Sequence, residues 1–333
     1  EAERVSGELA ARAERSQPPA EKGNKQEKES PEGNKWLAEK LKGLGRFSFS
    51  GDVRLRYEPI LGGALPRDRH RERIRLRFNA IAKLSDELTG GLTVASGDEL
   101  DPISTNQTLT SFFRRKPFSL DRAFIQYHPN WFKPLTLTGG KFAYTWYRTE
   151  LTFDNDLNPE GFSQALAFDF KNSVFKKLTL VGFQLPFRES GNLDDSFLHG
   201  GQIQSFWRFS DRVKFSGYAG FYNWHRADPV KEAQAAGALT GGANTNAATA
   251  SQFASKFALL DLLGRLDIDT GYARWPVVLQ LDFVNNTRPC TNLPATVVAC
   301  NPRDRSGWWA EVQLGQTNDC LLYTSPSPRD RTR

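Results

Sequence analysis

Apolar and polar residues alternate along the segment from Arg46 to Glu58. The apolar positions, one of them a glycine, are Phe47, Phe49, Gly51, Val53, Leu55 and Tyr57. Successive side chains of a β-strand point to opposite faces, so this two-residue period predicts a strand with one apolar and one polar face. Residues 73–84 repeat the pattern, and only Ile81 places an apolar residue among the polar positions.

The same period, with more exceptions, predicts ten further strands. They lie at residues 88–97, 119–128, 135–146, 162–172, 177–187, 201–210, 213–224, 257–268, 275–286 and 305–316. Most of the segments exceed the roughly five or six residues of a typical strand in a globular protein. A transmembrane strand tilted by about 45° needs about 9–11 residues. The segment lengths therefore favour a sheet that crosses a membrane.

The connections between these strands alternate between short and long. Short ones lie at residues 85–87, 129–134, 173–176, 211–212 and 269–274, and long ones at 59–70, 98–118, 147–161, 188–200, 225–256 and 287–304. Outer-membrane barrels have short periplasmic turns and long external loops. A soluble sandwich would explain the two-faced strands but not the sorted loops. We therefore predict an all-β fold, a transmembrane antiparallel up-and-down β-barrel, over residues 46–316.

Basic residues concentrate on the polar faces of the first two strands. Arg54 and Arg56 occupy the first strand, and Arg73, Arg75 and Arg77 occupy the second. An Arg that faces lipid near the bilayer midplane costs about 2–4 kcal/mol, so we expect these side chains to face the lumen. Further residues that we expect to line the pore are Lys83, Arg122 and Gln126.

The chain has 333 residues and a formal net charge of +6. A basic run such as Arg67 to Arg77 can indicate nucleic-acid binding. Here the arginines alternate with apolar residues on a strand, so no nucleic-acid partner is expected. Two interpretations of the lumen charge remain open. One is a pore with a weak anion preference, and the other is a solvated wall whose arginines pair with Asp52, Glu58 and later acids.

Aromatic residues make up 12% of the chain and gather near the predicted strand ends. Barrels carry aromatic girdles at both membrane interfaces, so this placement supports a membrane barrel. Examples of these aromatic residues are Trp131, Trp146, Tyr147, Trp275 and Trp308.

The connection at residues 98–118 is the candidate constriction loop. Arg114, Arg115 and Lys116 are its candidate gate charges. The alternative, a surface loop that caps the barrel, remains equally open.

Cys290 and Cys300 flank residues 291–299 within one predicted outer loop, where an oxidising location would allow a disulfide. Two free thiols are the alternative. The four histidines are scattered, without the spacing of a metal site. The hydrolase elbow, the phosphate-binding loop and the dinucleotide fingerprint are absent from the sequence. We therefore expect no metal, no cofactor and no catalytic site.

The two ends of the chain differ from the predicted barrel. Residues 1–45 combine a helix-prone stretch with a linker rich in Pro, Gly, Lys and Glu, and we expect a helical or disordered periplasmic segment. Residues 317–333 lack the two-residue period. Residues 320–330 resemble the translation of a sequencing adapter, so we expect this tail to be non-native. Because a water-filled porin has about 16–18 strands, we expect further strands in the intact protein.

Several segments of the chain resemble the putative-porin family of Gram-negative outer membranes. They read FSGDVRLRYE, RERIRLRFNAIAKL, DRAFIQY, LTLTGGKF and FDNDLNPEGFSQAL. The stretch Asp156 to Gly161, which follows Gly139 to Lys141, is the most specific. The resemblance covers about residues 46–316. It implies a general diffusion barrel, often preceded by a periplasmic helical segment.

The function that we expect is passive diffusion of small hydrophilic solutes or ions through a water-filled outer-membrane barrel. Outer-membrane lipid would surround it, and a homotrimer is a candidate assembly. Two other classes remain open. An anchor or adhesin barrel would bind partners with its outer loops, and an outer-membrane enzyme would carry a Ser-His-acid cluster on the outside.

Overall fold

The computed structural model describes residues 46–62, 67–109, 112–171, 174–189, 195–239, 246–272 and 275–315. The chain divides into two units, residues 1–45 and 46–333, and the described residues all belong to the second. The predicted periplasmic segment and the predicted non-native tail, residues 317–333, lie outside the described residues.

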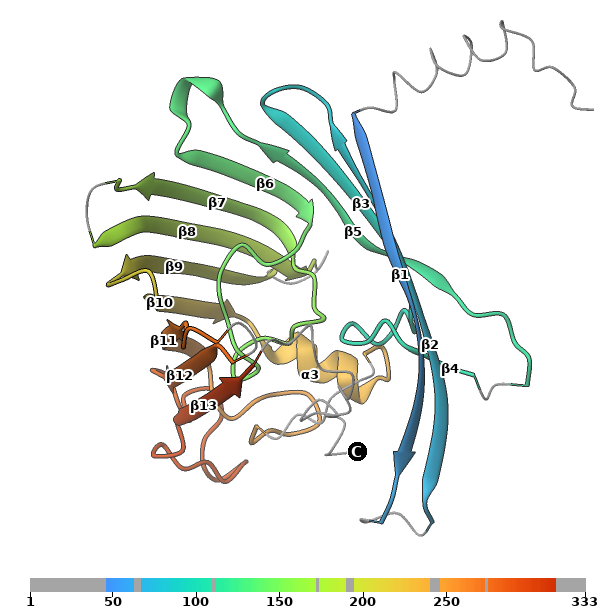
Figure 1. Ribbon diagram of the computed structural model, residues 1–333. Coiled ribbons are helices and arrows are strands. Elements are labelled where there is room, and N and C mark those ends of the chain that lie inside the picture. Colours follow the sequence, from blue (N-terminus) through green and yellow to red (C-terminus); the bar gives the residue numbers. More distant parts are fainter. Residues whose placement is uncertain are drawn as a thin grey trace, which may run out of the picture. The chain divides into compact units, whose positions relative to one another are not determined.

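Thirteen strands of the described residues form one antiparallel sheet. In chain order the strands are β1 (Phe47–Ile60), β2 (Arg69–Lys83), β3 (Leu88–Ser96), β4 (Gln107–Thr108), β5 (Phe118–Tyr127), β6 (Leu135–Lys141), β7 (Glu160–Asp169), β8 (Phe175–Arg188), β9 (Ser196–Arg208), β10 (Val213–His225), β11 (Phe257–Ile268), β12 (Val277–Asn286) and β13 (Ser306–Leu314). Twelve follow one another from β1 to β13 in chain order, and β4 pairs with β2 (Figure 1).

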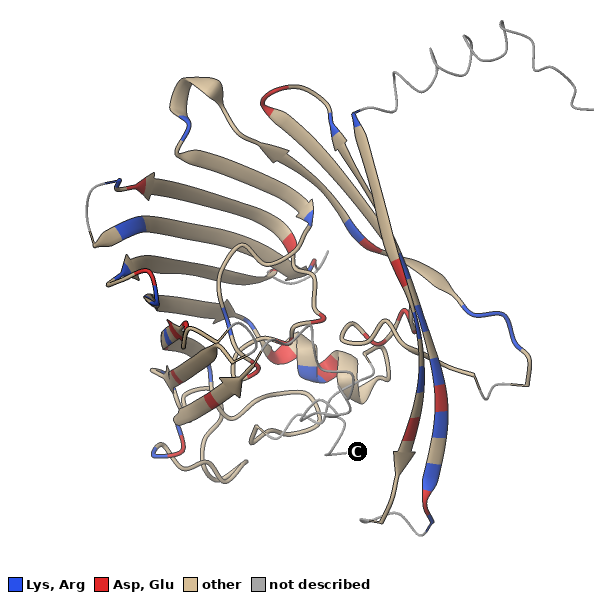
Figure 2. Cartoon of the chain, viewed as in Figure 1, with Lys and Arg blue, Asp and Glu red and all other residues tan. Residues whose placement is uncertain are grey.

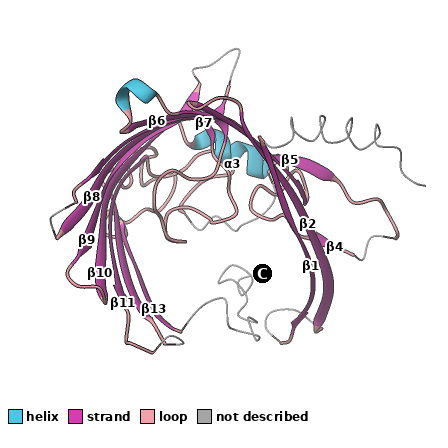
Figure 3. Ribbon diagram, turned by 45° about the horizontal axis from the view of Figure 1, so that its top comes forward, coloured by secondary structure: helices cyan, strands magenta, loops and turns pink. Residues whose placement is uncertain are grey.

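The predicted up-and-down topology is therefore confirmed. The sheet is strongly curved, and loops gather on its concave side (Figure 3). It is not closed within the described residues, where β1 and β13 form its two edges. No helix in the described part of the chain is long and apolar enough to cross a bilayer.

The two faces of the sheet follow the alternation in the sequence. In the β1–β2 pair, Leu55 lies opposite Ile74, and Arg54 lies opposite Arg75. Leu55 is 73% exposed, while Arg54 is partly buried. Because the register of an antiparallel pair keeps opposite residues on one face, apolar residues cover one side of this hairpin and arginines the other. We call the arginine side the interior face.

Besides the short strand β4, which was not predicted, the structure departs from the predicted elements in three main places. β6 ends at Lys141 rather than at residue 146. β9 begins at Ser196, five residues before the predicted start. The predicted loop at 225–256 contains a short helix, α3 (Asp228–Ala235), with a proline in its first turn, where the missing N–H has no helical partner to lose.

Gly140 explains why β6 ends early. Its φ of 115° lies in a region that favours glycine, and a Cβ there would lie 2.3 Å from the carbonyl oxygen of Ala123. The next residue, Lys141, is the last of β6, and residues 142–159, here called the inner loop, run along the interior face (Figure 1). Trp146 and Tyr147, expected at a membrane interface, lie in this loop instead.

An aromatic cluster attaches the inner loop to the sheet. The ring of Trp146 stacks on Phe183 of β8 with centroids 3.8 Å apart. The ring of Phe153 meets Tyr222 of β10 edge-on at 5.3 Å. Phe183 and Tyr222 are fully buried. Large buried rings of this kind dominate core energetics, so the loop is a packed part of the fold.

Exposed aromatic residues mark the short-turn end of the sheet. Each of four short turns carries at least one of them, and together they are Trp131, Phe132, Phe170, Phe209, Tyr272 and Trp275. Trp131 begins this series in the one-turn helix η1 (Asn130–Phe132), which joins β5 to β6. Such a row is typical of the aromatic girdle at a membrane interface.

Candidate functional site

The interior face of β1 and β2 carries a ladder of charged side chains. Arg54 lies opposite Arg75, and Arg56 lies opposite Arg73. Like charges directly opposite each other destabilise a sheet. Figure 2 shows that acidic positions interrupt the basic ones along these two strands, whereas the middle of β6 to β10 is uncharged. The acids therefore compensate the repulsion where it arises.

Asp52 and Glu58 are the two compensating acids. The carboxylate of Asp52 accepts hydrogen bonds from Arg75 Nη2 at 2.8 Å and from Arg77 Nε at 2.6 Å. Glu58, only 9% exposed, pairs with Arg56 at 2.7 Å and also with Arg71 and Arg73. Arg71 belongs to the ladder although the sequence did not single it out. We define the arginine ladder as Arg54, Arg56, Arg71, Arg73, Arg75 and Arg77.

The arginine ladder meets a third acid from the inner loop. Asp156 interacts electrostatically with Arg75, Arg77 and Arg54. Burial raises the pKa of the Asp156 carboxyl, and the three arginines oppose that rise. Among the described residues, the six arginines face three acids, Asp52, Glu58 and Asp156, so an excess of positive charge remains on this wall.

The other residues expected to line the pore lie farther along the sheet. Arg122 Nε donates to Asn158 Oδ1 of the inner loop at 2.7 Å. Gln126 Nε2 donates to Thr138 Oγ1 at 3.4 Å. Lys83 lies at the short-turn end and pairs with Asp86 at 3.1 Å, with 63% of its side chain exposed. The structure thus brings Arg122 to the inner loop but leaves Lys83 at the rim.

The connection at residues 98–118 has two parts. Asn106 Oδ1 accepts from Arg54 Nη2 at 2.6 Å, and Ser104 Oγ accepts from Arg73 Nη2 at 3.3 Å, so the first part lies on the arginine ladder. Of the candidate gate charges, Arg114 and Arg115 are exposed. Lys116 Nζ donates to the carbonyl oxygen of Thr108 at 2.6 Å. The part before β5 extends away from the sheet (Figure 1).

The inner loop is hydrogen-bonded to strands far along the sheet. The backbone N–H and carbonyl of Tyr147 bond the side chain of Gln202 in β9 at 2.8 and 2.7 Å. The Tyr147 hydroxyl donates to Gln280 Oε1 at 2.7 Å and accepts from Arg265 Nη1 at 3.1 Å. Thr149 Oγ1 donates to the buried carboxylate of Asp282. The loop therefore reaches from β6 to β9, β11 and β12.

Sequence reasoning placed residues 142–146 of this segment in a strand and residues 147–159 in an external loop. The signal that was available is its composition, because an aqueous loop has no need of Phe142, Trp146, Leu151 and Phe153 at short intervals. Phe142 and Trp146 are 1% and 3% exposed. Apolar residues in a long predicted connection can thus indicate a loop that folds inward.

A polar cavity of about 240 Å³ lies beside the inner loop. Its lining includes Arg148, Glu150, Arg265 and Glu311, so both signs of charge meet there. The guanidinium carbon of Arg148 lies 3.6 Å from the ring centre of Tyr144. Burial lowers the pKa of Arg148 and raises the pKa of Tyr144 to about 12, so Tyr144 stays neutral at pH 7.

Two of the three cysteines of the chain lie among the described residues. Cys290 and Cys300 form a disulfide in the connection from β12 to β13, with their Cα atoms 5.7 Å apart. Within the described ranges, no three His, Cys, Asp or Glu side chains are arranged to hold a metal ion.

Comparison with known proteins gives one family. The sequence model of a family described as putative porin matches residues 64–254, from just before β2 to the segment after α3. No curated protein matches the chain. The matched region is more than half of the chain and contains the inner loop and most of the arginine ladder. With its antiparallel up-and-down sheet, the chain therefore belongs to the putative porin family.

Proposed function

We propose that the protein is a general-diffusion porin of a Gram-negative outer membrane. Small hydrophilic solutes and ions would pass through its water-filled barrel without a catalytic step and with a weak preference for anions. Outer-membrane lipid would surround the barrel, residues 1–45 would lie in the periplasm, and a homotrimer is the assembly to test first.

The observation that carries this proposal is the sorting of residues between the two faces of the sheet. Val53 and Leu55 are 67% and 73% exposed on one face. The opposite face of the same strand holds Arg54 and Arg56. An Arg on the lipid side near the midplane costs about 2–4 kcal/mol, so only a lumen that contains water accommodates the ladder. This supports a polar channel on the interior side.

The excess of arginines over acids supports the anion preference. A charged ring in a pore attracts ions of the opposite sign. Here both interpretations of the ladder apply, because some arginines are paired with acids and the rest leave a positive charge that attracts anions. Asp52 and Glu58 neutralise part of the charge. The remaining positive charge would repel cations only weakly, because water and salt screen it. A modest selectivity follows rather than an exclusive one.

The inner loop is the constriction that we propose for this pore. Its one end is bonded to β9, β11 and β12 through Tyr147, and Asp156 near its other end faces the arginine ladder. Solutes would pass between that loop and the ladder. The same role for Arg114, Arg115 and Lys116 stays a prediction, and the exposure of Arg114 and Arg115 favours the alternative of a cap.

Conductance in planar bilayers tests the proposal. The protein expressed from its native gene and reconstituted alone should give stepwise current increases in KCl, and liposomes that contain it should swell in small neutral sugars. Bilayers without steps and liposomes without swelling would favour the anchor or adhesin class. Turnover of an ester or glycoside by the same preparation would favour an outer-membrane enzyme.

A further inference from the structure

A second group of positive charges lies at the long-loop end of the sheet, apart from the arginine ladder. It lines a cavity of about 380 Å³. The cavity lies between the ends of β8 and β10, the start of α3, the segment just before β11 and the connection that follows β12. The charged residues of the lining are Arg188, Arg226, Lys256, Arg288, Asp228 and Glu232.

The two acids of this cavity are already engaged by neighbouring groups. Glu232 Oε2 pairs with Arg188 Nη1 at 2.7 Å. Asp228 accepts the backbone N–H of Phe253 at 2.9 Å and the side-chain amide of Asn292 at 3.1 Å. These contacts tie α3 to the flanking segments, so Asp228 has a structural role and Glu232 is neutralised.

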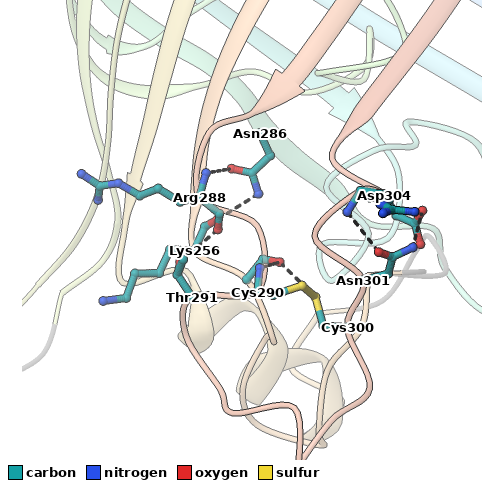
Figure 4. The surroundings of a disulfide bond; sticks show 10 residues. Lys256, Asn286, Arg288, Cys290, Thr291, Cys300, Asn301 and Asp304 are labelled. Atoms are coloured by element: carbon teal, nitrogen blue, oxygen red, sulfur yellow. Dashed lines mark hydrogen bonds between the residues drawn. A yellow bond between two sulfur atoms is a disulfide. The ribbon is translucent and has the colours of Figure 1, made fainter.

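Lys256 and Arg288 differ from the other charges. Both are exposed, and within the described residues neither the ammonium of Lys256 nor the guanidinium of Arg288 has a hydrogen bond or ion pair. Figure 4 shows the two side chains extending in the same direction from adjacent segments. They thus offer two unneutralised cations to one cavity.

One buried side chain fixes the backbone of both residues. Asn286 Nδ2 donates to the carbonyl oxygen of Lys256 at 2.9 Å, and Asn286 Oδ1 accepts from the N–H of Arg288 at 3.1 Å (Figure 4). Asn286 is only 9% exposed. The amide therefore clamps together two segments that are far apart in the sequence.

The disulfide strengthens this clamp. Cys290, two residues after Arg288, is bonded to Cys300, and its N–H donates to Ser255 Oγ at 2.8 Å. Ser255 directly precedes Lys256. The disulfide closes the connection after Arg288, and the hydrogen bond to Ser255 joins that connection to the segment of Lys256. Less backbone entropy is therefore lost when a ligand binds both residues.

We propose that Lys256 and Arg288 form a binding site for small soluble oxyanions, phosphate or carboxylate groups, at the long-loop mouth of the channel. A guanidinium presents paired N–H donors that match such groups, and an ammonium adds a second charge-assisted bond. The site rests on the proposed function for its purpose. It would concentrate anionic solutes before they reach the arginine ladder.

The test measures how inorganic phosphate affects the chloride current of single channels. Phosphate added on the long-loop side should reduce the wild-type current in a saturable way. In the double variant Lys256→Gln/Arg288→Gln, the apparent affinity should fall at least about tenfold, because two charge-assisted bonds are lost. The charge-keeping pair Lys256→Arg/Arg288→Lys should retain most of the inhibition.

A matched control removes the same charge elsewhere at this end. Lys231→Gln/Arg303→Gln changes two cations that do not line the cavity. Phosphate should inhibit the chloride current of this variant as strongly as that of the wild type. Equal inhibition of wild type and the Lys256→Gln/Arg288→Gln variant would overturn the site while leaving the porin intact. Absence of any current would instead contradict the proposed function.

Calorimetry in detergent without lipid tests the site independently of conduction. Wild type should bind inorganic phosphate, and the Lys256→Gln/Arg288→Gln variant should not. Phosphate groups also occur on lipid headgroups. Binding seen only with a phosphate-bearing lipid, and not with inorganic phosphate, would overturn the assignment of a soluble ligand.

Discussion

Glu58 illustrates at the residue scale how the charged face is stabilised. Its carboxylate pairs with Arg56, Arg71 and Arg73 although it is only 9% exposed. The period of the sequence placed Arg56 and Glu58 on one face of the first strand and Arg73 on the matching face of the second, and it did not include Arg71. It could not assign the pairs, because they depend on the register between β1 and β2 and on side-chain rotamers.

Removing the Glu58 charge should destabilise the β1–β2 hairpin. In Glu58→Gln three arginines lose their common acid, so we expect the free energy of unfolding to fall by about 1–3 kcal/mol. Urea unfolding of the protein in lipid measures it. Glu99→Gln, an exposed residue in the next long connection, should change little. An unchanged midpoint for Glu58→Gln would mean that water satisfies these arginines.

Asp156 should make ion selectivity depend on pH. Its pKa is raised, so it takes up a proton at a pH above the usual Asp value of about 3.9. Protonation removes a negative charge beside Arg54, Arg75 and Arg77. Anion preference should therefore increase as the pH falls through the raised pKa. Reversal potentials between pH 7 and pH 4 measure this, and Asp156→Asn should lose this part of the change.

The contribution of Asp156 to folding stability, like its effect on anion preference, is larger at low pH. Because the folded state holds this proton more tightly than the unfolded state, the contribution is complete below the usual Asp pKa. It is lost as the pH rises through the raised pKa.

If Asp156→Asn keeps the full pH dependence of the ion selectivity, a group other than Asp156 causes that dependence.

The strands and the inner loop differ in how well the sequence predicts them. Twelve strands were placed within a few residues because half-buried strands have a strict period. The inner loop was missed because its first residues were predicted to continue a strand and the rest has no period. Its position is set by Gly140 and by contacts with β8 to β12. Its apolar residues gave a signal of burial but not of the partner strands.

Gly140 should be intolerant of a side chain. Gly140→Ala places a Cβ 2.3 Å from the carbonyl oxygen of Ala123 and keeps a positive φ, so we expect a loss of at least about 2 kcal/mol in folding stability. Gly90→Ala, where the nearest atom is a Leu84 side-chain carbon at 3.5 Å, should be tolerated. Equal unfolding midpoints in the two variants would contradict the claim that position 140 requires glycine.

Tyr147 should hold the inner loop in place. Tyr147→Phe removes the hydroxyl that bonds Gln280 and Arg265, a local loss of about 1–2 kcal/mol. We expect larger open-channel current noise and a higher mean conductance, because a looser loop leaves the passage wider. Tyr272→Phe, in an exposed short turn, is the control. A conductance equal to that of the wild type would contradict the proposal that the inner loop is the constriction.

At the scale of the whole molecule, the sequence predicted the order of strands and the sorting of the two faces. Both follow from short-range rules, the strand period and the alternation of loop lengths. The sequence did not predict which loops fold inward or that Asn286 joins Lys256 to Arg288, because these contacts bring together residues far apart in the chain. In the proposed function, the charged wall and the packed loop together bound the passage.

The reversal potential in a KCl gradient tests this account most directly. Wild-type channels should show a modest anion preference, and Arg73→Gln/Arg75→Gln/Arg77→Gln should move the reversal potential toward that of a nonselective pore. Lys83→Gln, at the short-turn rim, should leave it unchanged. A cation-selective wild type, or a triple variant with the wild-type reversal potential, would contradict the claim that the arginine ladder lines the conducting pore.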